Sequence, residues 1–477
     1  MTRVLVVTSD PIGPKMAGPA IRSWNIALIL SENHDVRLMT TSLLDAQDAP
    51  FDQYLIPPGR HRAFAKLERW AEVIVFQGHA MSMFKSLRAS KKLLVADIYD
   101  PMHVEQLEQA RDLPFDEYKQ VVADRTELLN EQMLRADFLM CASDRQRLFY
   151  LGQLAALGRL NPLTYADEPD LKRLLTIVPF GLPSDAPVHQ RQVLKGVVPG
   201  IGVDDKVIIW GGGLYSWFDP LTLIRAIGVL AARRGNVRLF FQGTKHPGIA
   251  EMPIVEESRA LVRELGLEKH VFFNETWVPY DERQNYLMEA DVGVSTHGFH
   301  LETTLAFRTR ILDYLWTGLP MVVSKGDSFA QLIKREDLGI AVQPENVEAL
   351  ASALEKTLFN EKFAAAAREN IVRIDQAFRW EKVLEPLVNY VNDPWPAPDR
   401  QLIARESVVR IRLVKHYGVK HNADRARHYL RAGGVRAVAG KVGERMRARS
   451  RSVAPAEQAP PADEASRAET DASVADQ

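Results

Sequence analysis

Short apolar runs rich in β-branched residues recur along the whole chain, and segments with helical periodicity separate them. The runs occupy residues 4–8, 36–40, 73–76, 93–97, 138–141, 176–179, 207–210, 237–242, 271–273, 292–295 and 321–324. Such runs are typical of parallel strands that are covered on both faces. Segments 219–234 and 281–290 are examples of the helical patterns between them. The alternation predicts an α/β protein with doubly wound parallel sheets and right-handed crossovers.

Eleven strands are too many for one compact sheet of this kind, so the chain is expected to divide. The polar stretch 186–204, which contains several glycines and prolines, is the expected linker. It separates a first Rossmann-like domain, 1–185, from a second, 205–380. Residues 381–398 are expected to form a helix that packs back on the first domain. Ligands of open α/β sheets bind beyond the carboxyl ends of the strands, so the cleft between the two domains is the expected site.

The formal net charge of −1 hides opposite blocks of charge. Segment 399–451 forms a basic tail, since residues 401–451 hold 14 Lys and Arg against 3 Asp and Glu, a charge of +11. Residues 452–477 are acidic, rich in Ala and Pro, and expected to be disordered. The basic segment fits either docking to anionic lipid or a solvated surface helix. Sparse aromatic residues argue against nucleic acid. Because no apolar run reaches about 18 residues, a cytoplasmic location is expected.

Three glycines, Gly211, Gly212 and Gly213, end the run 207–210 and precede a helix that Asp219 would cap. Glycines let a phosphate approach the backbone closely, and the N–H groups of a helix start attract anions. The alternative is a tight turn that needs glycine for its geometry alone.

A second candidate region combines His297, His300 and Glu302 with a helix expected over about 304–317. Arg310 and Asp313 are three residues apart and share one face of that helix. A carboxylate can accept both ribose hydroxyls, and a guanidinium can clamp a diphosphate. The alternative is a surface ion pair. The spacing of the two histidines and the glutamate matches no strong metal motif, so no metal site is expected.

The first domain offers polar loops directly after its expected strands. They contain Asp10, the glycine loop at Gly18, His79, and the pair Asp100 and His103. All of these residues lie where cleft residues are expected, although a lone histidine after a strand is more often structural.

These motifs resemble a retaining GT-B glycosyltransferase of family 4, also called group 1, over about residues 1–395. Segment 310–323 resembles the family's K-x-x-E-Y-x-A-x-G-x-P-V-V, and segment 290–295 resembles A-D-V-x-V-x-P. Gly212 to Leu214 with segment 223–226 resembles G-R-L-x-x-x-K-G-x-x-x-L-I-x-A. In the first half, segment 136–143 and segment 178–182 look like A-D-x-V-x-x-S and I-P-N-G-V.

The resemblance implies roles for matching residues. Asp313 stands at the glutamate that binds the ribose, and Arg310 at a lysine that contacts the donor diphosphate. Gly18 would face the donor phosphates. The first domain would bind the acceptor and the second the donor, with Gly212, Gly213 and His297 on the donor side.

The chain also departs from the family pattern. Gly213 and Phe218 replace the arginine and lysine that the family has after the glycine turn, and Leu305 replaces the first glutamate of E-x7-E. We hypothesise that Glu302 takes over contact with the sugar hydroxyls, and that Arg308 or Lys245 supplies the missing positive charge.

The implied function is that of a retaining, hexosyltransferase-type enzyme. It would transfer a sugar from a nucleotide-diphosphate sugar to a glycan or polyprenyl-linked acceptor in cell-envelope polysaccharide synthesis, without a tightly bound metal or another cofactor. The enzyme would be cytoplasmic and peripheral at the inner face of the membrane through residues 401–451. Two alternatives remain open: a nucleotide-sugar 2-epimerase of GT-B fold, and a non-catalytic sugar-nucleotide-binding partner.

Overall fold

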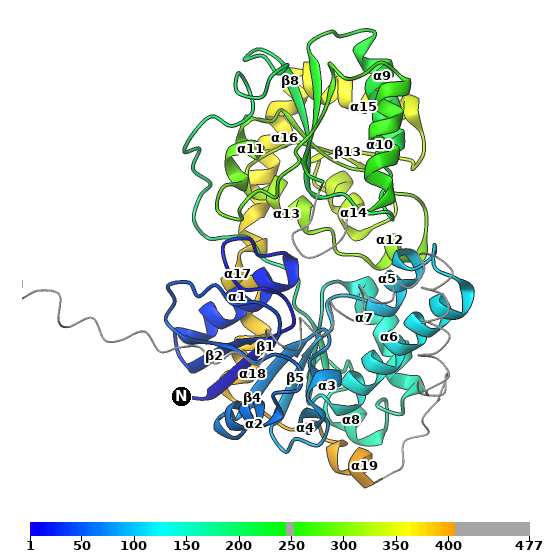
Figure 1. The fold of residues 1–477 in the computed structure, drawn as a ribbon. Coiled ribbons are helices and arrows are strands. Elements are labelled where there is room, and N and C mark those ends of the chain that lie inside the picture. The colour runs from blue at the N-terminus through cyan, green and yellow to red at the C-terminus, as the bar shows by residue number, and fades with distance from the viewer. Residues whose placement is uncertain (245–251, 406–477) are drawn as a thin grey trace, which may run out of the picture. The chain divides into compact units, whose positions relative to one another are not determined.

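The computed structural model describes residues 1–244 and 252–405, which contain two parallel sheets (Figure 1). The first sheet has the strand order β3-β2-β1-β4-β5-β6-β7. Its strands are β1 (Arg3–Thr8), β2 (Asp35–Thr40), β3 (Asp52–Leu55), β4 (Val73–Gln77), β5 (Leu93–Asp97), β6 (Phe138–Cys141) and β7 (Leu175–Ile177). The second sheet has the order β10-β9-β8-β11-β12-β13. Its strands are β8 (Lys206–Gly213), β9 (Val237–Gly243), β10 (Val271–Phe273), β11 (Val292–Ser295), β12 (Met321–Ser324) and β13 (Gly339–Val342). The predicted doubly wound α/β class is confirmed.

Helices cover both faces of each sheet. Successive strand residues point to opposite faces, so a strand that is apolar throughout packs against helices on both sides. The helices of the first domain are α1 (Gly18–Ser31), α2 (His61–Trp70), α3 (Ala80–Met83), α4 (Lys85–Arg88), α5 (Met102–Gln109), α6 (Phe115–Arg135), α7 (Asp144–Ala156) and α8 (Pro162–Asp167). In β1, Val4 and Val6 pack with α1, whereas Leu5 and Val7 pack with α2 and α6.

The second domain is layered in the same way. Its helices are α9 (Pro220–Ala231), α10 (Pro253–Glu264), α11 (Arg283–Glu289), α12 (Leu301–Leu305), α13 (Thr309–Trp316), α14 (Ser328–Arg335), α15 (Val347–Phe359) and α16 (Glu361–Ile374). In β8, Ile208 and Trp210 pack with α9, α10 and α15, whereas Val207 and Ile209 pack with α13 and α14.

The chain then returns to the first domain through the 3-10 helix η1 (Asp375–Phe378), α17 (Trp380–Val383) and α18 (Glu385–Asn392), and the last described helix is α19 (Arg400–Arg405) (Figure 1). Leu182 exchanges backbone hydrogen bonds with Phe378 and Trp380, at 2.6 and 3.0 Å. The ring of Tyr390 stacks on Phe138 of β6, with ring centroids 4.6 Å apart. These contacts join residues 378–390 to the first sheet.

Each predicted apolar run overlaps a strand, although β7 ends at Ile177 within the run 176–179. Two further strands, β3 and β13, were not predicted. Each of these is an edge strand. Strand β3 has the sequence Asp52-Gln-Tyr-Leu and is partly exposed along its whole length. Because β3 lies at an edge of the sheet and needs less apolar cover, it lacks the pattern that identifies a buried strand.

Three sequence-based predictions lie wholly or mainly outside the described residues. These are the proposed cation Lys245, the basic segment 401–451 beyond residue 405, and the acidic segment 452–477. Among the residues that are described, no helix is long and apolar enough to cross a membrane.

Candidate functional site

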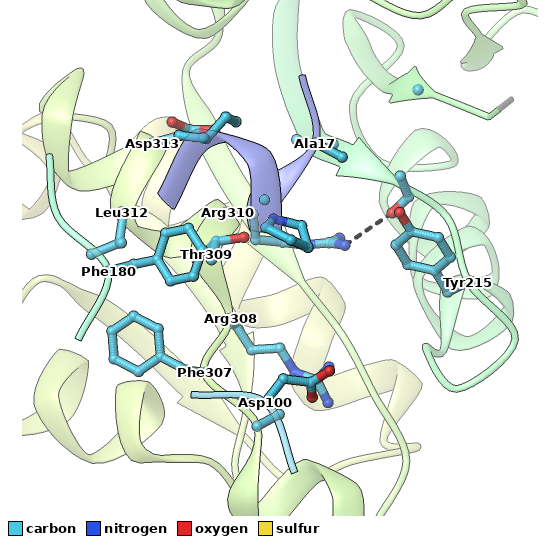
Figure 2. Close-up of a pocket in the computed structure, with 18 of the residues that line it drawn as sticks. Ala17, Asp100, Phe180, Tyr215, Phe307, Arg308, Thr309, Arg310, Leu312 and Asp313 are labelled. Atoms are coloured by element: carbon cyan, nitrogen blue, oxygen red, sulfur yellow. Dashed lines mark hydrogen bonds between the residues drawn. The ribbon is translucent and has the colours of Figure 1, made fainter. Parts of the chain in front are cut away.

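A cavity of about 440 Å³ opens where the carboxyl ends of both sheets meet. This volume is in the usual range for a small-molecule site. Gly18 at the start of α1 and Gly213 at the end of β8 line it from the two domains. Asp100, which follows β5, also lines it from the first domain, and Arg310 and Asp313 line it from the second (Figure 2). Two domains therefore supply the walls of one cavity.

The buried guanidinium of Arg22 fixes the start of α1 at the cavity. Its Nε and Nη2 donate to the two carboxylate oxygens of Asp97 at 2.6 and 2.9 Å. The carbonyl oxygens of Val178 and Pro179 accept further hydrogen bonds from it, at 2.8 and 2.7 Å. A buried ion pair with this many partners holds one geometry, so the glycine loop before α1 has a rigid support.

The glycine turn at the end of β8 forms the opposite wall. Gly212 has φ of +71°, a conformation that L side chains rarely adopt, and the strand register shifts between Trp210 and Gly213. A Cβ on Gly213 would lie 2.8 Å from the ring of Tyr215. The turn therefore needs glycine for its geometry, and it also lines the cavity. Asp219 caps α9 by accepting a hydrogen bond from Thr222 N at 2.9 Å, as predicted.

Arg310 projects from the first turn of α13 to this glycine turn. Its Nη2 donates to the carbonyl oxygen of Gly213 at 2.9 Å, and its guanidinium lies over the rings of Trp210 and Phe218, 4.4 and 4.2 Å from their centroids. Its Nη1 has no hydrogen-bond partner within the described residues. Burial lowers the pKa of Arg310 to about 10, so the side chain remains charged at neutral pH. A buried cation with an unused donor thus stands beside the turn.

Asp313 lines the same cavity one helical turn further along α13. Arg283, at the start of α11, donates from Nε to its carboxylate at 2.9 Å. The guanidinium of Arg283 lies over the rings of Tyr280 and Trp316, 3.6 and 4.6 Å from their centroids. The side chain of Asp313 remains 30% exposed, so its carboxylate can still accept hydrogen bonds from a ligand.

Glu302 and Arg308 form a buried, two-pronged ion pair, with N–O distances of 2.8 and 2.6 Å. The predicted helix over 304–317 is wrong, because the chain is helical only in α12 and α13 and is extended at Ala306 and Arg308. This break turns the Arg308 side chain back to Glu302. Both residues line the cavity, but each charge is largely neutralised by the other.

His297 is fully buried and is not among the residues that line the cavity. Its Nε2 lies 3.6 Å from the carboxylate of Asp327. His300 instead caps α12, since its Nδ1 accepts a hydrogen bond from Thr303 N at 3.2 Å. No group of three or more His, Cys, Asp or Glu suited to a metal ion occurs in ranges 1–244 and 252–405.

Three carboxyl groups from the first domain line the cavity: Asp10, Asp100 and Glu105. Burial raises the pKa of Glu105 well above its ordinary value, and the charge of Asp100 and a hydrogen bond to it raise the pKa further. Burial also raises the pKa of Asp100 and of Asp10. A carboxyl group with a raised pKa keeps its proton to a higher pH, and the protonated form can donate a hydrogen bond or a proton.

Sequence reasoning missed Glu105 and Arg283 as site residues. Glu105 carries no motif, and Arg283 reaches Asp313 across 30 residues of chain. Only the helical pattern over 281–290 gave any signal near Arg283.

The two facing α/β domains, with a cleft at the strand ends, define a GT-B fold. Residues 205–360, most of the second domain, match the family model of "Glycosyl transferases group 1". The predicted fold and the predicted group 1 resemblance are confirmed.

Solved structures support the fold assignment at low sequence identity. Sucrose-phosphate synthase from Thermosynechococcus elongatus is 16% identical at a TM-score of 0.58, over 85% of this chain and 100% of its own. WaaG, a glycosyltransferase involved in lipopolysaccharide biosynthesis, is 18% identical with a TM-score of 0.55, over 82% of this chain and 100% of its own. HepE from Anabaena, in complex with UDP-glucose, is 15% identical with a TM-score of 0.55, over 85% of this chain and 98% of its own. None of the curated proteins matches this chain.

Proposed function

We propose that this protein is a retaining glycosyltransferase that transfers a sugar from a nucleoside-diphosphate sugar to an acceptor hydroxyl. The observation that carries the proposal is Arg310, a buried cation with an unused Nη1 beside a glycine turn at the carboxyl end of β8. Backbone N–H groups at such a turn, together with a guanidinium, suit a diphosphate. The solved complex of HepE with UDP-glucose adds support by fold likeness.

In this proposal Arg310 replaces the two cations that the family has after the glycine turn. Its side chain comes from α13 instead of from the turn, and it lies over Phe218, the residue at one of the two missing positions. Negative charge builds on the diphosphate oxygens as the anomeric bond breaks, and a prepositioned cation stabilises it. Arg310 supplies this charge within the protein, so the proposal needs no tightly bound metal.

Asp313 binds the ribose hydroxyls in this proposal, held in place by Arg283. Aspartate is one methylene shorter than the glutamate of the family motif. The bond from Arg283 Nε occupies one carboxylate oxygen and leaves the other for the ligand. A retaining outcome follows from attack on the same face of the sugar, with the leaving phosphate accepting the proton of the acceptor hydroxyl.

The acceptor is proposed to be a glycan or a polyprenyl-linked glycan in cell-envelope polysaccharide synthesis, reached from the cytoplasmic face of the membrane. WaaG, a glycosyltransferase involved in lipopolysaccharide biosynthesis, shares the fold. The basic segment 401–451 is the proposed membrane contact. Deletion of residues 399–477 is expected to abolish co-sedimentation with anionic vesicles, and retained co-sedimentation would refute that contact.

Thermal unfolding with a panel of nucleotide sugars tests the proposed donor class. A ligand that binds only the native state raises the melting temperature, and the rise grows with the ratio of its concentration to its Kd. At least one nucleoside-diphosphate sugar should protect the protein, and its nucleoside monophosphate should protect less. Equal protection by monophosphate and diphosphate would contradict the role given to Arg310.

A nucleotide-sugar 2-epimerase is the second candidate, because the carboxyl groups of Asp10, Asp100 and Glu105 line the cavity. Epimerisation needs acid and base groups around the sugar and no acceptor. Incubation with donor alone separates the two: an epimerase produces the epimeric nucleotide sugar, whereas a transferase slowly releases the free sugar.

A further inference from the structure

Gln146 connects the two domains through one buried side-chain amide. The residue lies in the first turn of α7 and is fully buried. Its Oε1 accepts a hydrogen bond from Ala142 N at 2.7 Å, which fixes the side chain within the first domain. Its Nε2 donates to the carbonyl oxygen of Tyr99 at 2.8 Å and to that of Leu305 at 2.9 Å. One amide group therefore bridges the loop after β5 and the last residue of α12.

Arg145, the preceding residue, makes a second connection of the same kind. Its Nη1 donates to the carbonyl oxygens of Thr304 and Gly326, both in the second domain. Helix α12 itself lies against α5 and α7 (Figure 1). The first turn of α7 thus reaches three backbone carbonyls of the second domain.

The bridged carbonyls adjoin the part of the cavity that Asp100, Glu302 and Arg308 line, which is the sugar end in the proposed function. Tyr99 directly precedes Asp100, and Leu305 directly precedes the extended segment that leads to Arg308. These neighbours line the cavity. A change in either hydrogen bond of the Gln146 Nε2 would therefore move one cavity wall relative to the other.

We propose that Gln146, assisted by Arg145, is a positioning residue that clasps the two domains and excludes water from the sugar end of the cavity. This inference rests on the proposed function, because the clasp would determine how much of the bound donor is transferred to the acceptor and how much is hydrolysed. Water that enters an incompletely closed transferase site attacks the donor in place of the acceptor. The nucleotide end depends on Arg310 and Asp313, which the clasp does not contact.

The test compares Gln146→Met with Gln153→Met. Methionine keeps the length of the side chain and removes its hydrogen bonds. Gln153 also lies on α7, but its amide donates to Asn130 Oδ1 within the first domain, at 2.7 Å. The probe is UDP-glucose, or whichever nucleotide sugar of the panel protects the protein most.

We expect Gln146→Met to raise the ratio of donor hydrolysis to transfer by roughly fivefold or more, which is the factor expected from the loss of the two hydrogen bonds that Nε2 donates. Its affinity for the nucleoside diphosphate should match that of the wild type. Gln153→Met should leave the ratio unchanged. An unchanged ratio in Gln146→Met, or equal rises in both variants, would overturn the proposal.

Hydrogen–deuterium exchange provides a readout that needs no activity. Backbone amides of residues 301–309 should exchange faster in Gln146→Met and in Arg145→Ala than in the wild type, but not in Gln153→Met. If Gln146→Met does not fold, Arg145→Ala alone carries the test. Wild-type protein that binds no nucleotide sugar would refute the proposed function, whereas unchanged exchange in a folded clasp variant would refute the clasp.

Discussion

Replacement of Arg310 by methionine should not reduce the stability of the empty protein, but it should weaken binding of a nucleoside diphosphate. Methionine is unbranched and flexible, so it can fill the space over Trp210 and Phe218 without the charge. The substitution removes the hydrogen bond to Gly213 O and the unused Nη1 donor. The expected effects on the empty protein and on its ligand complex are therefore opposite in sign.

The magnitude follows from the pKa of Arg310, which burial lowers from 12.5 to about 10. At about 1.36 kcal/mol per pKa unit, holding the charge in the empty cavity costs about 3 kcal/mol. Because a pKa of 10 leaves the group charged in the native and unfolded states below pH 9, this cost does not vary with pH there. Loss of the hydrogen bond and ring contacts offsets part of the gain. Arg310→Met should therefore be between unchanged and about 3 kcal/mol more stable.

Binding of a nucleoside diphosphate should weaken in the same variant. A hydrogen bond to a charged group contributes about 1.5–3 kcal/mol, which is roughly 10- to 150-fold in Kd. Urea unfolding of the empty protein and titration calorimetry with UDP measure the two effects. Arg225→Met, at an exposed position of α9, is the matched control and should change neither. A variant more than about 1 kcal/mol less stable, or one with wild-type affinity, would refute the reasoning.

Further substitutions test the remaining contacts of the cavity. Arg308→Ala leaves the carboxylate of Glu302 buried without its arginine partner, so this variant should lose about 3–5 kcal/mol of stability in urea unfolding. The double variant Arg308→Met/Glu302→Leu should lose much less stability, because it leaves no buried charge. Equal losses in the two variants would contradict this. Turnover should fall in Glu302→Gln and in Arg308→Ala, and unchanged turnover in both would exclude them from the site. Asp313→Asn should weaken UDP binding about tenfold and leave inorganic diphosphate binding unchanged, and Arg283→Met should act in the same direction because it frees the Asp313 side chain. The pKa of Glu105 is raised in the folded state, so its protonation stabilises the fold at low pH and this contribution is lost as pH rises through that pKa. Unfolding from pH 4 to 8 should show a flatter decline in Glu105→Gln, and identical profiles would count against a protonated Glu105.

The strands of this fold were readable from sequence because most of them are buried. Runs such as Val4–Val7 of β1 are fully apolar, and only burial on both faces of a parallel sheet produces that pattern. The edge strand β3 lacked it. The break between α12 and α13 was also missed, because the Glu302–Arg308 ion pair that accompanies it forms only in the folded chain.

The site was readable only where motifs mark it. Gly212, Gly213, Arg310 and Asp313 were found from the glycine turn, the helical spacing and the family resemblance, and they do line the cavity, whereas His297 lies outside it. Other cavity and clasp residues come together from distant segments of the chain. The amide of Gln146, for example, donates a hydrogen bond to Leu305, which is 159 residues away in the sequence, and no local pattern predicts such a contact.

The fate of the donor sugar distinguishes a retaining transferase from an inverting enzyme and from an epimerase. Proton NMR of the protein with the protective nucleotide sugar alone follows both the nucleotide and the anomeric configuration of any free sugar before mutarotation. The account predicts slow release of nucleoside diphosphate together with free sugar that keeps the anomeric configuration of the donor. Release of inverted sugar, or an epimeric nucleotide sugar without release of nucleotide, would contradict it.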